Sequence, residues 1–250
     1  MSKAAKKAPT LSVYGADSEI RRALVVVAHP DDVDFGSAGT IATLTGQGVE
    51  VSYCLVTSGD AGGDSSTLSN AERAAERERE QRAAAAEVGV RELTFLGYPD
   101  GRVQVSLELR HDIARVIRRD QPDLVITQSP ERNWRRIFAS HPDHMAAGEA
   151  TLCAVYPDAR NPHAFPDLLR VGYQPHRVRQ VWLASAPQPT MVVDITDTFS
   201  RKMAALGRHV SQVGEREDLE DTVRAWARET AKAAGLGKRR LGEAFRVVHT

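Results

Sequence analysis

One buried strand that ends in two adjacent carboxylates constrains this chain more than any other feature. The apolar segment from Ala23 to Ala28 contains three consecutive valines, which disfavour a helix and suit a strand buried on both faces. Pro30 has no amide hydrogen to give to a sheet, so the chain must turn at the strand's carboxyl end. Asp31 and Asp32 would repel each other in this turn unless a cation lies beside them, so the sequence favours a metal ion here.

Strand and helix patterns alternate along the rest of the chain. Helices are predicted over 36–47, 71–87, 107–119, 145–155, 202–209 and 216–234. Strands are predicted over 49–57, 93–96, 124–127, 178–184 and 191–195. Asn70 is the expected cap of the second helix, and Thr196 or Asp197 that of the fifth. Because such alternation is typical of βαβ units, we expect an α/β fold: a Rossmann-like, mainly parallel β-sheet flanked by helices, with the active site at the carboxyl ends of the strands.

Length, charge and cysteine content narrow the possible functions. A chain of 250 residues fits a single domain, which we place at 19–250 after a flexible tail at 1–18. Lysine plus arginine and aspartate plus glutamate each total 33, so the overall charge offers no attraction for nucleic acid. No apolar run is long enough to cross a bilayer, so no stable membrane insertion is expected. Cys54 and Cys153 are too few for a disulfide framework, and without a signal-peptide pattern they indicate a cytoplasmic protein.

The sequence His-Pro-Asp occurs twice, at 29–31 and at 141–143. Each copy is predicted to leave a strand at the ligand-binding edge of the sheet, so we expect the two to converge. A catalytic zinc takes three protein ligands, drawn from His, Asp and Glu among others, and keeps one position open for water. His29, Asp32 and His144 could supply that set.

The other residues of the two motifs have separate candidate roles. Asp31 would lie beside the activated water, where it could accept the water's proton as a general base. His141 would stabilise developing charge or protonate a leaving group. Asp143 would orient an imidazole, cap the following helix, or do both.

The segments Ala28-His29-Pro30-Asp31-Asp32 and His141-Pro142-Asp143-His144 resemble motifs of the PIG-L/LmbE-like family of zinc-dependent N-deacetylases. Members of that family remove acetyl groups from N-acetylated amino sugars and related conjugates. The resemblance extends over most of the chain, through Val33-Asp34-Phe35-Gly36, Val56-Thr57-Ser58-Gly59, Leu96-Gly97-Tyr98-Pro99-Asp100-Gly101, His209-Val210-Ser211-Gln212 and Glu243-Ala244-Phe245. The chain departs from the family pattern at Ser58, where an acidic residue is common, and at Ser37-Ala38, where Cys-Gly is frequent.

The resemblance implies a role for each motif residue. It makes His29, Asp32 and His144 the metal ligands. It makes Asp31 the general base and His141 the electrostatic or acid group.

Two substrate contacts rest on the resemblance alone. Arg77 and Asp100 fall at positions similar to the family's sugar-contacting arginine and aspartate, with Arg73 as a rival to Arg77 on the same arginine-rich helix. From the residues alone, Arg77 is a charge on a solvated helix. Asp100 is equally well explained as part of a Pro-Asp-Gly turn.

We therefore expect an enzyme that uses Zn²⁺, or another divalent metal such as Fe²⁺, to remove an N-acetyl group from an N-acetylglucosamine-type amino sugar or its conjugate. Its binding partner would be this small molecule. Whether the protein forms a homo-oligomer stays an open question. Two alternatives also stay open: a metal-independent, Rossmann-like module that binds a nucleotide or sugar, and a metal hydrolase that cleaves an ester or another amide. The glycines at 59–63 form neither a Gly-x-Gly-x-x-Gly nor a Gly-Lys-Ser/Thr motif, which argues against nucleotide binding.

Overall fold

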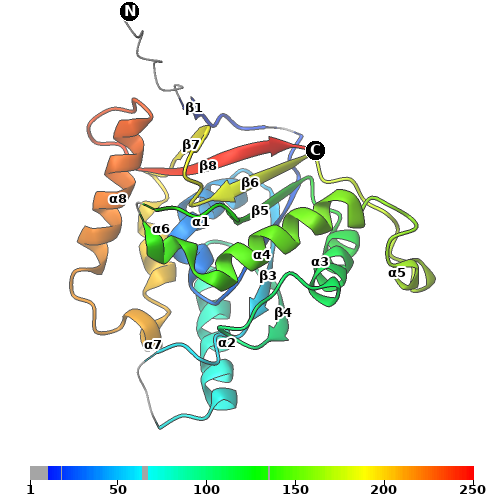
Figure 1. The fold of residues 1–250 in the computed structure, drawn as a ribbon. Helices are drawn as coiled ribbons and strands as arrows, with labels where there is room; N and C mark the ends of the chain where they lie inside the picture. Colours follow the sequence, from blue (N-terminus) through cyan, green and yellow to red (C-terminus); the bar gives the residue numbers. More distant parts are fainter. Residues whose placement is uncertain (1–10, 18, 64–66, 135) are drawn as a thin grey trace, which may run out of the picture.

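A computed structural model describes residues 11–250 except 18, 64–66 and 135 (Figure 1). Within this part of the chain, eight strands form one sheet in the order β1-β7-β8-β6-β5-β2-β3-β4. Neighbouring strands are parallel except that β8 runs antiparallel to both β6 and β7. The predicted Rossmann-like, mainly parallel α/β fold is confirmed.

The predicted central strand is β2 (Arg22–Val27), and its side chains alternate between two cores. Val25 and Val27 belong to one core and Leu24 and Val26 to the other, as a strand buried on both faces requires. The other strands are β1 (Ser12–Val13), β3 (Glu50–Thr57), β4 (Glu92–Tyr98), β5 (Leu124–Gln128), β6 (Gln180–Ala184), β7 (Met191–Asp194) and β8 (Gly242–His249).

Helices cover both faces of the sheet (Figure 1). The core that contains Val25 is covered by α1 (Asp32–Gly46), α2 (Asn70–Glu87), α6 (Phe199–Leu206) and α8 (Leu219–Ala233). The core that contains Leu24 is covered by α3 (Leu107–Asp120) and α4 (Pro142–Cys153). Shorter helical segments are η1 (Ile137–Ser140), η2 (Ala154–Asp158), α5 (Pro166–Arg170) and α7 (Val210–Val213).

Several predicted boundaries are wrong, and two of the differences concern the site. Helix α1 begins at Asp32 rather than at Gly36, and α4 begins at Pro142 rather than at Met145. Asp32 and Asp143 therefore each lie in the first turn of a helix. The second His-Pro-Asp motif does not leave a strand directly, because a loop and η1 separate it from β5.

The caps also differ from expectation. Ser69 rather than Asn70 caps α2, because Ser69 and Glu72 form a reciprocal capping box. Thr198, rather than Thr196 or Asp197, precedes α6. Strand β8 is absent from the predicted strands, because Glu243 and Arg246 interrupt its apolar pattern.

The strand order creates a topological switch point between β2 and β5. Strand β2 pairs with β3 on one side and with β5 on the other, so the connections run in opposite directions from it. A crevice forms at such a switch point, outside the carboxyl ends of the two strands. The loops that follow β2 and β5 carry the two His-Pro-Asp motifs, so the topology brings these motifs to the crevice.

The beginning of the chain is only partly described. Within the tail predicted at 1–18, Ser12–Val13 forms β1 and pairs with β7, while residues 1–10 and 18 lie outside the described residues. Across the described part of the chain, no helix combines the length and the apolar character needed to span a bilayer.

A glycine in α4 fixes the distance between this helix and β5. A Cβ atom at Gly148 would lie 2.2 Å from the main-chain oxygen of Gln128, so Gly148→Ala must push the helix from the strand. We expect the substitution to lower the free energy of unfolding by roughly 1–3 kcal/mol, measured by urea denaturation. Gly46→Ala is the matched control, because a Cβ there meets no atom within 4 Å. Equal stability of the two variants would contradict this packing argument.

Candidate metal centre

The turn after β2 sends its two carboxylates in different directions. Asp31 has φ 84° and ψ −26°, a left-handed conformation that residues other than glycine, asparagine and aspartate rarely adopt. Asp32 begins α1, and its carboxylate faces His29 and His144. The carboxylate of Asp31 faces Arg77 instead. The repulsion expected from the sequence is thus relieved by separation as well as by positive neighbours.

The Asp32 carboxylate lies between two imidazoles. Its Oδ1 is 2.9 Å from His144 Nε2, and its Oδ2 is 3.3 Å from His29 Nδ1. Oδ2 also accepts a hydrogen bond of 2.7 Å from the main-chain N–H of His29. Burial alone would raise the pKa of Asp32, but His144 and His29 outweigh burial and hold this pKa well below its usual range. Asp32 is therefore ionised.

The other ring nitrogen of His29 faces two more carboxylates. Nε2 is 3.0 Å from Asp100 Oδ1 and 3.2 Å from Asp143 Oδ2. Burial alone would lower the pKa of His29, but Asp32, Asp100 and Asp143 outweigh burial and raise this pKa to about 12. Three carboxylates around one imidazole give the site an excess of negative charge, which a bound cation would balance.

His29, Asp32 and His144 bring two imidazoles and one carboxylate together. Each of the two rings contacts a different oxygen of Asp32, His144 at 2.9 Å and His29 at 3.3 Å. Imidazole and carboxylate are also the ligands that catalytic zinc prefers. A set of three such ligands would leave a fourth position for water or substrate.

Asp143 contacts His29 at Nε2, the ring nitrogen that faces away from Asp32. Its side chain is buried, and its oxygens accept main-chain hydrogen bonds from Gly101 at 2.7 Å and Val103 at 3.2 Å. A carboxylate that accepts the second N–H of a ligating histidine fixes the ring's orientation and its tautomer. Nε2 of His29 thus faces Asp100 and Asp143, while its Nδ1 faces Asp32.

Two overlapping groups of donor atoms could hold an ion within the described residues. One consists of His29, His141 and His144, and the other of His29, Asp100 and Asp143. The main-chain contacts of Asp143 use both of its oxygens, and its side chain is closed to solvent. The group that contains His144 lies on the Asp32 side of His29, because Asp32 Oδ1 is 2.9 Å from His144 Nε2.

His141 lies beside this set as a neutral donor. Its ring centroid is 5.1 Å from that of His29 and 5.3 Å from that of His144. Burial, followed by these two histidines, lowers the pKa of His141. The main-chain N–H of Asp143 donates to Nδ1 at 3.2 Å, so Nδ1 carries no proton and the neutral ring holds its proton on Nε2.

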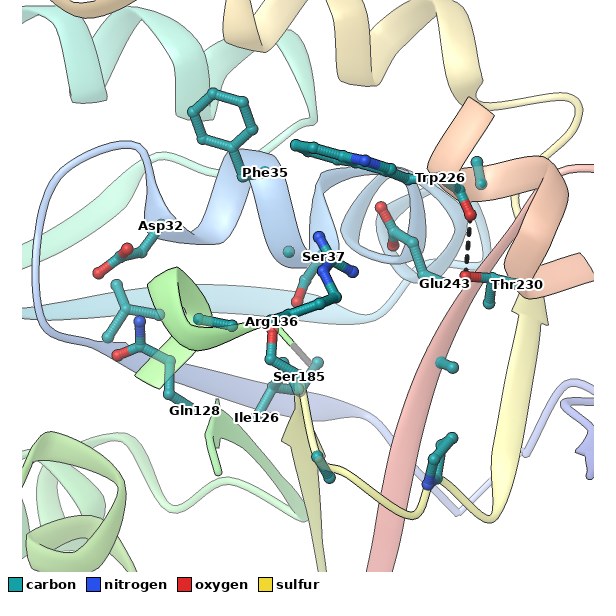
Figure 2. Close-up of a pocket in the computed structure, with 18 of the residues that line it drawn as sticks. Asp32, Phe35, Ser37, Ile126, Gln128, Arg136, Ser185, Trp226, Thr230 and Glu243 are labelled. Carbon is teal, nitrogen blue, oxygen red and sulfur yellow. Dashed lines mark hydrogen bonds between the residues drawn. The ribbon is translucent and has the colours of Figure 1, made fainter. Parts of the chain in front are cut away.

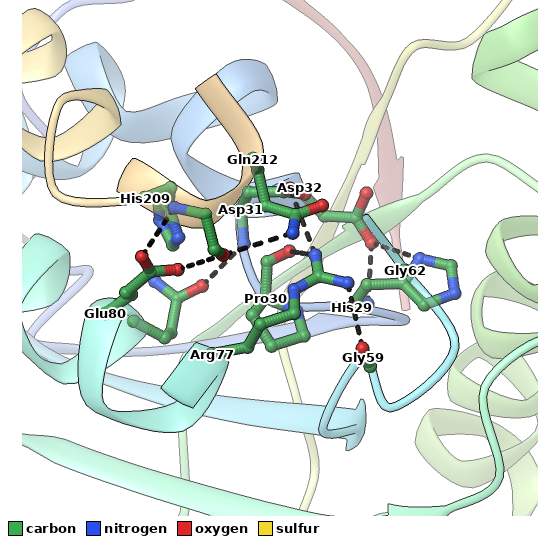
Figure 3. A network of polar contacts seen from close by, with 12 residues as sticks. His29, Pro30, Asp31, Asp32, Gly59, Gly62, Arg77, Glu80, His209 and Gln212 are labelled. Atoms are coloured by element: carbon green, nitrogen blue, oxygen red, sulfur yellow. Dashed lines mark hydrogen bonds and ion pairs between the residues drawn. The ribbon is translucent and has the colours of Figure 1, made fainter. Parts of the chain in front are cut away.

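Arg77 is buried under the turn that carries Asp31 (Figure 3). Its guanidinium donates to the Pro30 carbonyl at 2.7 Å and to the Gly59 carbonyl at 3.2 Å, and it lies 3.1 Å from Asp31 Oδ2. A Cβ at either Gly59 or Gly62 would lie 2.3 Å from Arg77 Nη1, so both glycines are needed for this approach.

The predicted substrate contacts lie around the loop after β3. Arg73 donates to the Gly62 carbonyl at 2.9 Å, whereas Arg77 reaches Asp31. Asp100 Oδ2 accepts from the main-chain N–H of Ala61 at 3.2 Å, while its Oδ1 faces His29. Contact of Arg77, Arg73 or Asp100 with a sugar stays a prediction.

Burial controls the protonation of Asp31. It raises the pKa of Asp31 to about 6, against the opposing effect of Arg77 and with a further contribution from Asp32. A carboxyl with a pKa in this range can both accept and return a proton near neutral pH.

A cavity of about 470 Å³ opens at Asp32 and His144 (Figure 2). It continues over the sheet toward α8, between apolar side chains such as Val27 and Ile126 and polar ones such as Ser185. This volume is within the range of sites that hold a small molecule.

Arg136 lines this cavity beside two aromatic rings, Phe138 and Trp226, which stack on each other with their centroids 6.3 Å apart. Its guanidinium carbon is 5.1 Å from the ring centre of Phe138 and 4.9 Å from that of Trp226. These cation–π contacts join the loop after β5 to α8 across the cavity wall.

Three buried residues beside the site carry no predicted role: Asp34 and His209, which lie in segments that resemble the family, and Gln81. His209 Nε2 is 2.8 Å from Asp34 Oδ2, and Gln81 Nε2 donates to the same oxygen at 2.9 Å. All three are fully buried. Gln81 was detectable in principle, since it is an uncharged side chain within a charged run and lies one helical turn after Arg77.

Comparison with known proteins finds similar proteins that are described as deacetylases. The family model described as GlcNAc-PI de-N-acetylase (PIG-L) matches residues 24–155. The diacetylchitobiose deacetylase of Thermococcus kodakarensis is 32% identical over 202 residues, 79% of this chain and 72% of that protein. The 1D-myo-inositol 2-acetamido-2-deoxy-alpha-D-glucopyranoside deacetylase of Nakamurella multipartita is 29% identical over 251 residues, covering 80% of this chain and 82% of that protein.

A solved structure agrees over nearly the whole chain. It is the N,N'-diacetylchitobiose deacetylase of Pyrococcus horikoshii in complex with its inhibitor MPG, with a TM-score of 0.85 and 32% sequence identity. The match covers 92% of this chain and 85% of that one.

The geometry predicts that His144 holds the metal. We expect His144→Ala to lose most of its bound divalent metal, because it removes one of three ligands, as measured by elemental analysis of protein purified without added metal. His163→Ala, at an exposed histidine, is the control and should keep full occupancy. Full occupancy in His144→Ala would instead favour the group formed by His29, Asp100 and Asp143.

Proposed function

Because the chain belongs to the PIG-L family of GlcNAc-PI de-N-acetylases, we propose that it is a metal-dependent hydrolase that removes an N-acetyl group from an N-acetylglucosamine-type amino sugar or its conjugate. The observation that carries the proposal is the Asp32 carboxylate, which joins His29 and His144 at the mouth of a cavity. Asp31, the adjacent residue, supplies a second carboxyl that is not used in that set.

His29, Asp32 and His144 would hold the ion, which we take to be Zn²⁺. When bound, such an ion polarises an amide carbonyl and lowers the pKa of a water molecule to about 7. Asp143 and Asp100 hold the ring of His29 in place from its other nitrogen.

The proton transfers fall to this chain's own residues. Asp31 accepts the proton of the attacking water, and its raised pKa suits this task. His141 Nε2–H donates to the carbonyl oxygen as negative charge develops there, because Nδ1 is already occupied by a main-chain N–H. Asp31, now protonated, returns the proton to the amine as the carbon–nitrogen bond breaks.

The names of the relatives support an amino sugar as the substrate. The archaeal relatives are named for N,N'-diacetylchitobiose and the actinobacterial one for an inositol glycoside of N-acetylglucosamine. The cavity exceeds the needs of an acetyl group, so a larger part of such a conjugate would enter it. We propose that Arg77 and Asp100, with Arg73 as the alternative arginine, contact the sugar.

The cysteines fit a reducing compartment, and we propose a cytoplasmic location. Cys54 and Cys153 are free, and burial raises the pKa of Cys54 to about 12, so this thiol is inert.

The reaction can be tested directly. We expect the purified protein to release acetate from N-acetylglucosamine or N,N'-diacetylchitobiose, and a chelator to abolish the release because the metal is removed. Acetate and free amine are both measured, so that cleavage of an ester is not mistaken for deacetylation. If acetate is released only from O-acetyl compounds, the enzyme is an esterase. If the protein binds the sugar equally with and without chelator and releases nothing, it is a binding module.

The base assignment can be tested separately. We expect Asp31→Asn to lower kcat by about two to four orders of magnitude, because the amide cannot accept the water proton. Its metal content should equal that of the wild type, since the ligands are untouched. Near-normal turnover by this variant would remove Asp31 from the mechanism.

A further inference from the structure

The Pro30–Asp31 peptide is held from both sides by one face of α2. Arg77 Nη2 donates to the Pro30 carbonyl at 2.7 Å, and Gln81 Oε1 accepts from the Asp31 N–H at 2.8 Å. The carbonyl and the N–H belong to the same peptide unit. Arg77 and Gln81 are four residues apart, so they project from the same side of the helix.

This peptide precedes a residue in an unfavourable conformation. Asp31 has φ 84°, and holding a non-glycine side chain in such a region costs of the order of 1–3 kcal/mol. Rotation of the peptide toward a relaxed conformation would break both hydrogen bonds at once. The two side chains therefore keep Asp31 left-handed, and this conformation sets the direction in which its carboxylate leaves the backbone.

Gln81 is itself fixed by a buried chain of polar groups. Its Nε2 donates to Asp34 Oδ2 at 2.9 Å, and the same oxygen is 2.8 Å from His209 Nε2. The main-chain N–H of Asp31 can only donate and the Asp34 carboxylate can only accept, so the amide of Gln81 has one consistent orientation. Gln81, Asp34 and His209 are each fully buried.

We propose that Gln81 is a positioning residue for the general base. It acts by holding the Asp31 backbone, and through it the Asp31 carboxylate, at the point where the attacking water loses its proton. The inference rests on the proposed function, in which Asp31 is that base. Among the described residues, Gln81 forms no hydrogen bond with His29, Asp32 or His144, so its effect should fall on proton transfer rather than on metal binding.

The test compares Gln81→Met in two backgrounds, using the full-length, zinc-loaded enzyme and N,N'-diacetylchitobiose. In the wild-type background we expect kcat to fall about 10- to 100-fold, because small displacements of a reacting group have effects of this size. KM and zinc content should stay within about twofold of wild type. In the Asp31→Asn background Gln81→Met should change the residual rate by less than about twofold, since the group that it positions is already absent.

Controls separate this role from a purely structural one. Arg79 lies on the exposed side of α2, so Arg79→Met should leave kcat unchanged. Gln81→Asn keeps a buried amide but shortens its reach, so it replaces Gln81→Met in both backgrounds if the methionine variant does not fold. The proposal would be overturned if Gln81→Met lowered kcat by the same factor in both backgrounds, or if it lowered kcat in neither.

Failure of the proposed function gives a different result. If Asp31→Asn turns over at nearly the wild-type rate, the base assignment is wrong and the positioning role falls with it. If Asp31→Asn is inactive and the loss from Gln81→Met persists in that background, the base assignment stands and only the role of Gln81 is wrong.

Discussion

The contact of the Asp32 carboxylate with two imidazoles organises the residues at the carboxyl ends of the central strands. One imidazole, His29, follows β2, and the other, His144, lies in the first turn of α4. The contact therefore joins the two strands on either side of the topological switch point. It needs α1 to begin at Asp32 and α4 to lie close to β5, which Gly148 permits. An excess of carboxylates around His29 makes a cation the natural complement of the arrangement.

The same turn gives neighbouring carboxylates different environments. Asp32 is stabilised in its ionised form by two histidines, whereas burial raises the pKa of Asp31. Groups whose surroundings move their pKa values apart can divide acid–base and ligand roles between them. The left-handed conformation of Asp31 makes this division geometrically possible, and α2 supplies the hydrogen bonds that hold it.

The sequence predicted the fold where local pattern and tertiary environment agree. The valines of β2 indicated a doubly buried strand, and the alternation of elements indicated a parallel sheet. It failed for β8, an antiparallel strand whose apolar pattern is broken by charges. One of these charges, Glu243, is buried against Lys202 at 2.6 Å, a pairing that joins segments far apart in the chain and leaves no local signal.

Taken alone, the sequence determined which chemical groups meet at the edge of the sheet, because a proline after a buried strand and two His-Pro-Asp motifs are local features. The resemblance also assigned a role to each group, but the contacts of these groups depend on the tertiary structure. It placed Asp32 between His29 and His144, turned Asp31 toward Arg77, and put Gln81 beneath the same peptide. The reason is that ligand geometry, burial and backbone strain depend on side chains from distant helices, whose approach no local pattern specifies.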